Sequence, residues 1–452
     1  MNQKNLVVFL IIAFIGTNSF GQEILSAYIN EGLENNPAMN RENFSLQQQV
    51  EGIKEAKGMF FPKVDFMANY TVARGGRSIG LPIGDMLNPI YQDLNVLKGS
   101  DSYPANLENV NESFLPNNFQ ETKFRVTQPI LDPQIYYNLK IQEEQYNGQL
   151  AQKQAYENFL TGEIKIAYFN YLQSLDVLRV YESSKNILEE NLRVNEKLVA
   201  NNKATRDVIY NSQHELDLLE NNIVQSMKNL AASKAYFNFL LNRNLAEEIA
   251  VDSAIAKVSW EELSYEALED QALQNRKELQ KIESGLRATE QRVKLNQAGN
   301  LPKLGVIADV GYQGFGYDFG SDQDFALLQA GLTWNLFSGN LNKARVQKAK
   351  IQHDILGKQK EEVQNQIKLE TLNAYNDLRA ALAYVKANES GLESASQSFR
   401  IIRKKYDQQL VSLLEYQDSQ YRFTNAQINV SLAKYNYLTK KAILERNIAG
   451  EL

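Results

Sequence analysis

The feature that most limits how this chain can fold is its long proline-free stretches, in which most residues at every seventh position are apolar. Between residues 133 and 201 no proline interrupts the sequence, and the spacing runs through Ile164, Tyr171, Leu178, Lys185, Leu192 and Val199. Such spacing over several heptads indicates left-handed coiled-coil packing. A helix of about 68 residues would be ~100 Å long, so it must project from any compact domain.

Three further helices are predicted from the same spacing. The second follows the turn at Asn201 and Asn202, the third spans about 340–406, and the last follows the turn at Gln408 and Gln409. Their sevenfold positions are Ile209, Leu216, Ile223, Leu230 and Phe237, then Leu378, Val385, Leu392, Phe399 and Tyr406, and finally Leu414, Tyr421, Ile428 and Tyr435. The sequence therefore predicts two long hairpins of antiparallel coiled-coil helices.

Four short runs alternate instead between apolar and polar residues, which is the pattern of half-exposed strands. They span 63–73, 119–127, 303–315 and 324–337. In the first run Val64 and Phe66 share one face, while Lys63 and Asp65 share the other. Strands of this length match the ~9–11 residues that cross a bilayer when tilted. The connection 74–118 carries many apolar side chains, so we expect it to pack on another part of the protein.

The two halves of the chain repeat one another. Helices predicted over about 23–59 and 261–298 end before Pro62 and Pro302, because proline lacks a backbone donor. The tripeptides that follow match at an offset of 240: Pro62-Lys63-Val64 and Pro302-Lys303-Leu304. We therefore predict two internal repeats, over about 22–250 and 261–452.

The first 21 residues predict a secretory signal peptide, because Lys4 precedes an apolar run over 6–15 and mostly small or polar residues follow. This run is too short to span a bilayer, which needs ~20 residues. The chain contains no cysteine, which excludes disulfides, thiolate metal sites and a lipid-modified cysteine. Its net charge of −6 argues against a nucleic-acid partner.

Four strands cannot form a closed barrel by themselves. An open sheet in lipid would leave backbone groups unpaired at several kcal/mol each, and known membrane barrels need at least about eight strands. If these strands cross a membrane, the chain must oligomerise.

The order and spacing of these elements resemble the TolC family of outer-membrane efflux proteins over essentially the whole chain after the signal peptide. The resemblance is carried by the helix–strand junctions Phe61-Pro62-Lys63 and Leu301-Pro302-Lys303, by the turn segments 203–208 and 410–416, and by the C-terminal segment 433–438. It implies a mainly α chain whose long helices form a periplasmic tunnel. It also implies a homotrimer in which four β-strands per protomer complete a 12-stranded membrane β-barrel.

The resemblance further implies a passive export duct in the outer membrane of a Gram-negative cell. Such ducts belong to tripartite efflux or secretion systems. They work with a periplasmic adaptor (membrane fusion protein) and an inner-membrane transporter of the RND, ABC or MFS type. The long connection 74–118 would then be an extracellular cap or plug.

Candidate sites follow at the two turns. Glu415 and Asp418 lie three residues apart on one helix face, and three copies of this pair would form acidic rings at the tunnel entrance. Asp207 is the counterpart in the first repeat, and an ordinary solvated helix face is the alternative. Asn201 and Gln409 stand where the family often has glycine. The adaptor-docking residues that the resemblance implies are Thr205, Arg206, Val411 and Ser412.

Other chemistry is poorly supported. The chain has two histidines, His214 and His353, far apart in sequence, so we predict no metal, no cofactor and no catalytic site. Tyr70, Tyr312 and Trp334 would belong to aromatic girdles at the membrane interface. A trimeric stalk or adhesin-like protein without transport is the alternative function, and a soluble binding protein or an enzyme is less supported.

Overall fold

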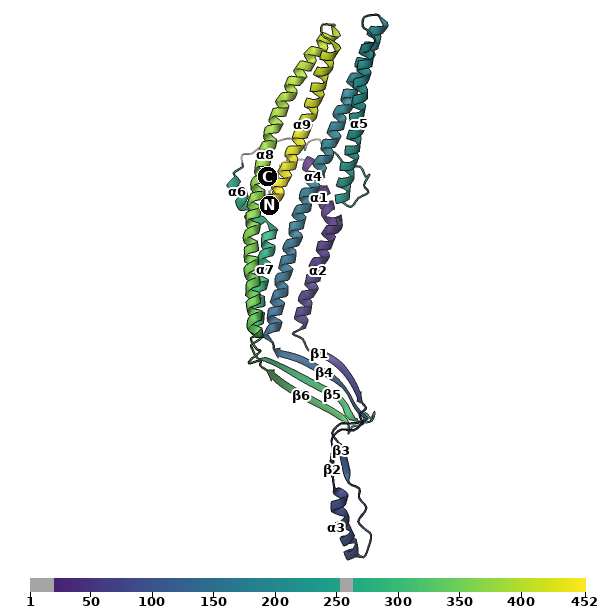
Figure 1. Ribbon diagram of the computed structural model, residues 1–452, viewed down its shortest axis with the longest axis vertical. Coiled ribbons are helices and arrows are strands. Elements are labelled where there is room, and N and C mark those ends of the chain that lie inside the picture. The colour runs from purple at the N-terminus through teal and green to yellow at the C-terminus, as the bar shows by residue number, and fades with distance from the viewer. Residues whose placement is uncertain (1–19, 253–262) are drawn as a thin grey trace, which may run out of the picture. The chain divides into compact units, whose positions relative to one another are not determined.

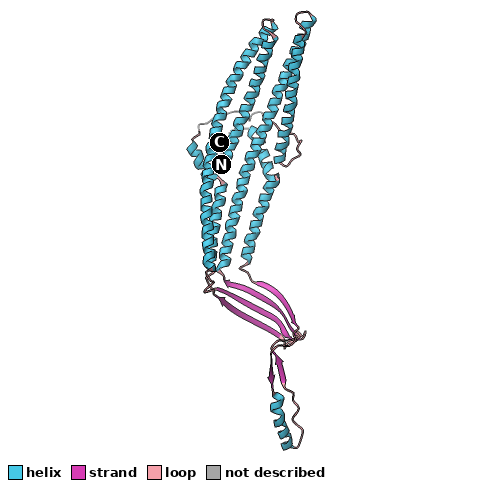
Figure 2. Cartoon of the chain, viewed as in Figure 1, coloured by secondary structure: helices cyan, strands magenta, loops and turns pink. Residues whose placement is uncertain are grey.

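The computed structural model describes residues 20–252 and 263–452, which form long helices and one four-stranded sheet (Figures 1 and 2). The chain divides into two compact units. The helical unit contains the described residues up to 50 and those within 144–287 and 353–452, and the strand unit contains 51–143 and 288–352. Each unit draws on both sequence repeats. The predicted signal peptide lies outside the described residues except for its last two.

The long helices have the extents that the heptads predict. They are α4 (Pro133–Ala200), α5 (Asp207–Leu240), α8 (Leu341–Asp407) and α9 (Leu413–Ile448). The shorter helices that precede the strands are α1 (Phe20–Asn35), α2 (Pro37–Gly58), α6 (Tyr265–Asn275) and α7 (Lys277–Ala298). Among the described helices, none combines the length and the apolarity that a membrane span requires.

Two helices predicted as continuous are each broken by a single residue. At the first break Asn36 caps α2, because its Oδ1 accepts from the N–H groups of Ala38 (2.9 Å) and Met39 (3.2 Å). Its Nδ2 donates to the carbonyl of Leu240 over 2.9 Å. At the second break Arg276 is extended, with φ −60° and ψ 117°. The predicted helix over 261–298 was wrong at Arg276, since this residue carries no turn signal of its own.

The core of the helical unit collects side chains from both hairpins. Its fully buried members include Ile164, Tyr168, Leu172, Phe237, Leu444 and Ile448. The predicted heptad residues that are buried include Ile164, Tyr171, Leu178, Leu378, Val385 and Phe399. The sevenfold pattern therefore locates the packed side of α4 over 164–178 and of α8 over 378–399.

Toward the end of α4 the packed side departs from the predicted heptad. Lys185, Leu192 and Val199 are only partly buried, whereas Asn191 and Asn195 are buried. A straight helix drifts by ~20° per heptad against a strict seven-residue repeat, so the contact seam moves to neighbouring residues. At this end of α4 the predicted Leu192 still packs against the buried Leu188, but the seam also contains the buried polar side chains of Asn191 and Asn195.

The strand unit contains an antiparallel sheet in the order β1-β4-β5-β6. Its strands are β1 (Lys63–Thr71), β4 (Phe119–Leu131), β5 (Lys303–Phe315) and β6 (Asp324–Thr333). Against the predicted bounds, β4 extends past residue 127, and β1 and β6 end before residues 73 and 337. In the described sheet β1 and β6 each have one neighbour, so both edges are open.

One face of this sheet is apolar and exposed. Phe66 pairs with Phe124, which in turn pairs with Val310. Val310 pairs with Ala326, so this row crosses all four strands. The side chains of Phe66, Phe124 and Val310 are 62%, 58% and 61% exposed. Removing such a face from water is favourable by ~25 cal/mol per Å², so it calls for an apolar environment.

The opposite face carries a charged cluster that joins β4 to β5. Arg125 donates from Nε and Nη2 to the two carboxylate oxygens of Asp309, over 2.8 and 2.7 Å. Lys123 Nζ lies 3.1 Å from Asp309 Oδ2 and 2.5 Å from Glu121 Oε1. Because the cluster spans two strands far apart in sequence, it stabilises this strand register on the polar face.

The connection 74–118, here called the arm, is ordered. It contains a two-stranded ribbon of β2 (Ser78–Leu81) and β3 (Val110–Ser113), and the helix α3 (Ile83–Lys98). The arm begins after β1 and returns at β4, which are neighbouring strands at one edge of the sheet. A plain linker would not need this secondary structure.

Candidate functional site at the helical tips

The candidate site comprises two turns. The first tip, residues 198–210, joins α4 to α5, and the second tip, residues 405–418, joins α8 to α9 (Figure 1). At the first tip the N–H of Lys203 donates to the carbonyl of Leu198 over 2.8 Å, and Asn202 is left-handed with φ 54°. This is a Schellman end, in which one left-handed residue lets the chain satisfy the last carbonyls. The left-handed residue is therefore Asn202, one residue after Asn201, which stands where the family often has glycine.

The second tip repeats this backbone. The N–H of Leu410 donates to the carbonyl of Lys405 over 2.9 Å. Gln409 is the left-handed residue, with φ 55°, as its predicted position implies. Glutamine is an unfavourable choice there, because the left-handed conformation costs roughly 1–2 kcal/mol for residues other than glycine, asparagine or aspartate.

The tips differ where the second helix of each hairpin begins. Ser412 caps α9: its Oγ accepts from the N–H of Glu415 over 3.2 Å, and Glu415 Oε2 accepts from the N–H of Ser412 over 3.1 Å. This reciprocal pair is a capping box. At the first tip Arg206 makes no side-chain cap, and the hydroxyl of Thr205 donates to the carboxylate of Asp207.

The predicted acidic residues are exposed, and each has a local partner. Glu415 accepts from the N–H of Ser412, and Asp418 Oδ2 accepts from Arg422 Nε over 2.8 Å. Asp207 lies on the other hairpin, where it contacts Thr205. The structure therefore joins Glu415 and Asp418 only through their helix. Of the predicted docking residues, Val411 is half-buried and the exposed ones are Thr205, Arg206 and Ser412.

A buried polar network lies beneath the tips, and sequence reasoning missed it. Asn195 donates from Nδ2 to Ser212 Oγ over 2.8 Å and to Asn191 Oδ1 over 3.1 Å. The hydroxyl of Tyr406 donates to Asn195 Oδ1 over 2.7 Å. The network joins α4 and α5 to α8, so it ties one hairpin to the other. The available signal was the pair of asparagines four residues apart on a packed helix.

A tyrosine stack continues this network into the second tip. The ring of Tyr416 stacks on Tyr406 with centroids 4.7 Å apart, and it lies 5.8 Å from the ring of Phe399. Tyr416 is only 4% exposed. Burial raises the pKa of Tyr416 to about 12, because the phenolate would lose its hydration. Burial also raises the pKa of Tyr406.

A groove of about 400 Å³ opens near the start of α9, lined by α4, α5 and α9. Ser184 and Thr424 are hydrogen-bonded at 2.8 Å along its wall. Gln417 Nε2 and Gln420 Oε1 are buried there and have no hydrogen-bond partner among the described residues. An unsatisfied buried polar group costs ~1–3 kcal/mol, so the groove is suited to a partner that brings its own polar groups.

Comparison with known proteins identifies the fold. A family model described as "Outer membrane efflux protein" matches residues 268–450. The outer membrane protein TolC of Escherichia coli is 22% identical over 454 residues, covering 96% of this chain and 84% of TolC. The outer-membrane channel OprN superposes with a TM-score of 0.73 at 14% identity, covering 95% of this chain and 90% of OprN. The chain is thus similar to the TolC family of outer-membrane efflux proteins, in sequence and in fold.

Two further similarities fit this family. The Campylobacter jejuni CmeC outer membrane channel has a TM-score of 0.75 at 13% identity, covering 95% of this chain and 86% of CmeC. The alkaline protease secretion protein AprF of Pseudomonas aeruginosa is 24% identical over 295 residues, covering 63% of this chain and 60% of AprF. Together these similarities support an outer-membrane duct of efflux or secretion, as the resemblance predicted.

The aromatic residues predicted for the membrane interface lie near both ends of the strands. Tyr70 and Tyr312 are close to the end where the arm leaves, and Tyr70 stacks on Tyr317 with centroids 5.1 Å apart. Trp334 follows the last residue of β6 at the other end, and its Nε1 donates to the carbonyl of Asn300 over 2.9 Å.

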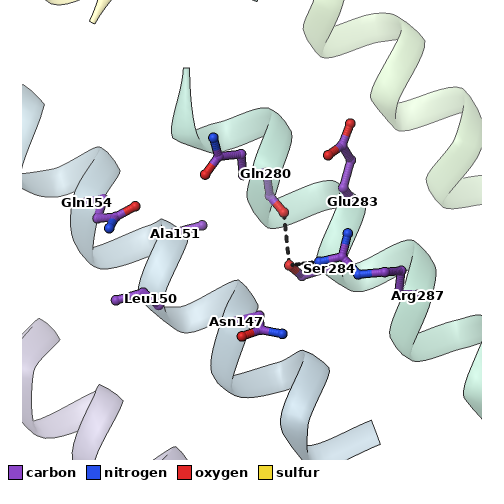
Figure 3. A pocket seen from close by; sticks show the side chains of 8 residues that line it. All are labelled: Asn147, Leu150, Ala151, Gln154, Gln280, Glu283, Ser284 and Arg287. Atoms are coloured by element: carbon purple, nitrogen blue, oxygen red, sulfur yellow. Dashed lines mark hydrogen bonds between the residues drawn. The ribbon is translucent and has the colours of Figure 1, made fainter. Parts of the chain in front are cut away.

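A second hollow, of about 390 Å³, lies between α4 and α7 (Figure 3). Ser284 Oγ donates to the carbonyl of Gln280 over 3.0 Å and accepts from Arg287 Nη2 over 2.9 Å. Arg287 Nε also donates to Glu144 over 2.8 Å. Ser284 and Arg287 thus find their hydrogen-bond partners within α4 and α7, as side chains of a helix-packing seam do. Across the residues described, no group of three His, Cys, Asp or Glu side chains could hold a metal ion.

Proposed function

We propose that three copies of this chain form a passive duct, with a 12-stranded barrel in the outer membrane and a helical tunnel in the periplasm. The four-stranded sheet carries the proposal, because both its edges are open and its outer face exposes Phe66, Phe124 and Val310. Unpaired edges in lipid cost several kcal/mol per backbone group, and membrane barrels need about eight strands or more. Three copies of four strands satisfy both requirements.

Native mass measurement of the protein extracted from outer membranes tests this assembly. We expect a complex of three chains that resists dodecyl sulfate until it is heated. A monomer in the same membrane fraction would contradict the trimer. A trimer that supports no export and copurifies with no transporter would instead favour the alternative function, a trimeric stalk without transport.

The same proposal places a periplasmic adaptor at the tips and an inner-membrane transporter beyond it. Thr205, Arg206 and Ser412 are exposed, and the groove that contains Gln420 is open to a partner helix. A photo-crosslinking residue at Arg206 should capture the adaptor in whole cells. The same residue at Lys358, which is 79% exposed along α8, is the matched control and should not. The transporter recovered with the adaptor decides between the RND, ABC and MFS types.

The acidic residues at the second tip, together with Asp207, form the entrance ring in this proposal. Glu415→Gln with Asp418→Asn removes both charges, and the Gln amide oxygen keeps the capping box with Ser412. We expect a higher single-channel conductance and weaker block by multivalent cations, since rings of carboxylates bind cations. Unchanged bilayer recordings would rule the ring out and leave an ordinary solvated helix face.

A further inference from the structure

The arm is held together by its own side chains. Asn88 of α3 binds the segment that runs from α3 back to β3, here called the returning chain, through both groups of its amide. Its Nδ2 donates to the carbonyl of Leu107 over 2.9 Å, and its Oδ1 accepts from the N–H of Leu107 over 2.7 Å. Asn95, one heptad later, makes the same pair with Tyr103, over 2.8 and 3.0 Å. These asparagines fix which side of α3 faces the returning chain.

The other side of α3 is apolar and exposed. Met86, Ile90 and Leu97 are 66%, 51% and 83% exposed. With Ile83 they follow the a and d positions of a heptad, because Ile83, Ile90 and Leu97 are seven residues apart and Met86 is three after Ile83. An isolated helix of this length is marginal in water, and an exposed apolar stripe indicates that it packs on a partner.

The base of the arm is tied to the rim of the sheet. Asn117 Oδ1 accepts from the N–H of Ala73 over 3.0 Å, and the carbonyl of Asn118 accepts from the N–H of Gly316 over 2.6 Å. The arm also begins directly after β1, which is an edge strand. In the proposed trimer, three arms would therefore rise from one rim, one beside each seam between protomers.

We infer that the apolar stripes of three arms pack on one another as a short parallel three-helix cap over the mouth of the barrel. This inference rests on the proposed trimer. Threefold symmetry brings the same residue of each helix to the axis, so Ile90 meets Ile90 and Leu97 meets Leu97. Asp93 occupies a d position and would bring three carboxylates together, which weakens the cap and allows it to open.

Charge favours other copies of the chain over a lipid surface as the occupant. Helices that lie on membranes carry Lys and Arg along their polar face. In α3 the charged side chains are Asp85, Asp93 and a single Lys98. The whole arm holds five carboxylates, and its basic side chains are Arg74, Arg77 and Lys98. An anionic membrane surface would repel this segment.

Single cysteines test the cap on a clean background, because the chain has no cysteine of its own. Ile90→Cys should form disulfide-linked dimers on mild oxidation of the purified trimer, since two copies of the residue would lie within disulfide reach. Gln92→Cys is the matched control: it is exposed on the same helix but lies about 200° round from Ile90, and it should stay unlinked.

Each result decides the matter. Linkage at Ile90→Cys alone supports the cap. No linkage in an intact trimer, or equal linkage at both positions, overturns it while leaving the proposed duct untouched. Protection of Ile90→Cys from a water-soluble maleimide only when lipid vesicles are present would assign the stripe to lipid, and overturn the cap. If the unmodified protein forms no trimer, both the proposed duct and the cap are ruled out.

A conductance measurement provides a second test that needs no disulfide. Ile90→Asn with Leu97→Asn should increase the open fraction of single channels in planar bilayers, and Asp93→Leu should decrease it. Gln92→Asn should behave as the unmodified protein does. An open fraction that none of these variants changes would overturn the cap even if the arms can be linked.

Discussion

The two helical tips share one backbone and differ in the side chains that stabilise it. Asn202 and Gln409 have the same left-handed φ, and 207 residues separate them. Thr205 and Ser412 are 207 residues apart as well, yet only Ser412 caps a helix. The first tip has a residue suited to its turn and an uncapped helix. The second tip has an unsuited residue and a capping box.

The two predicted repeats therefore share the backbone geometry of their tips and differ in the side-chain contacts that favour it. A capping side chain contributes ~1 kcal/mol, and relief of a left-handed residue contributes about as much. Each tip therefore reaches similar stability by a different route. The acidic residue Glu415 belongs to this local chemistry, since it is half of the capping box.

Breaking the tether between the hairpins should have the largest effect. Asn195→Ala removes the partner of Ser212 and Tyr406 in a fully buried site, and we expect a loss of ~1–3 kcal/mol in the free energy of unfolding. Thermal unfolding followed by circular dichroism measures it. Tyr406→Phe is the control, which loses one hydrogen bond and keeps the stack on Tyr416. An equal loss of unfolding free energy in both variants would show that the hydrogen bond from Tyr406 accounts for the whole effect, and that the other contacts of Asn195 add nothing.

The second largest effect should come from high pH, which should lower the stability of the second tip and not that of the first. The pKa of Tyr416 is raised to about 12 from an unfolded value of about 10, so its contribution is complete below pH 10 and is lost as the pH rises through 12. At about pH 11 the second tip should lose on the order of 1 kcal/mol. The first tip should not, because its tyrosine, Tyr210, is 69% exposed.

Pulsed hydrogen exchange on peptides from each tip, at matched intrinsic rates, checks this difference. The double variant Tyr406→Phe with Tyr416→Phe should remove the alkaline loosening of the second tip, because burial raises the pKa of both tyrosines. Loosening that persists in this variant would assign the effect to another group.

Removing the capping box should weaken only the second tip. Ser412→Ala should destabilise the first turn of α9 by ~1 kcal/mol, because the N–H of Glu415 loses its acceptor. Thr205→Ala is the matched change at the first tip, where the hydroxyl bonds to Asp207 and not to the backbone, so α5 should be unaffected. Hydrogen exchange in the first turns of α5 and α9 compares them. Equal losses would mean that Thr205 caps after all.

Glycine at the left-handed residues should have the smallest effect, with the opposite sign. Gln409→Gly relieves a disfavoured φ, and we expect stabilisation of roughly 0.5–1 kcal/mol after the entropy that glycine adds to the unfolded chain. Asn202→Gly should change stability by only a few tenths of a kcal/mol, since asparagine tolerates this conformation. Melting temperatures of the two variants suffice, and a larger gain at Asn202 would reverse the comparison.

Much of the fold could be predicted because periodicity reports on packing directly. The sevenfold spacing located the long helices, and the alternation at Val64 and Phe66 identified the exposed face of β1. The break at Arg276 was missed because its cause is not local: Arg276 Nη1 donates to Glu370 over 3.2 Å and to the carbonyl of Asn447 over 3.3 Å.

The site was predictable only in outline, for the same reason. Tip positions follow from where the heptads stop, but their side-chain partners depend on helix ends and on neighbouring helices. The network of Asn195, Ser212 and Tyr406 comes from three helices, and no pattern along one of them contains it. The cluster at Asp309 likewise needs the register of β4 against β5, which sequence alternation leaves open.

The sheet has a consequence for the order of folding. Phe124 pairs with Val310, 186 residues later, whereas the contact between Asn195 and Ser212 closes a loop of only 17 residues. Loop-closure entropy must be overcome before a distant pairing stabilises anything, so structures rich in distant contacts form slowly. We therefore expect the helical hairpins to form first and the β4–β5 pairing last. The apolar face that suits a bilayer would then be assembled only when most of the chain is already folded.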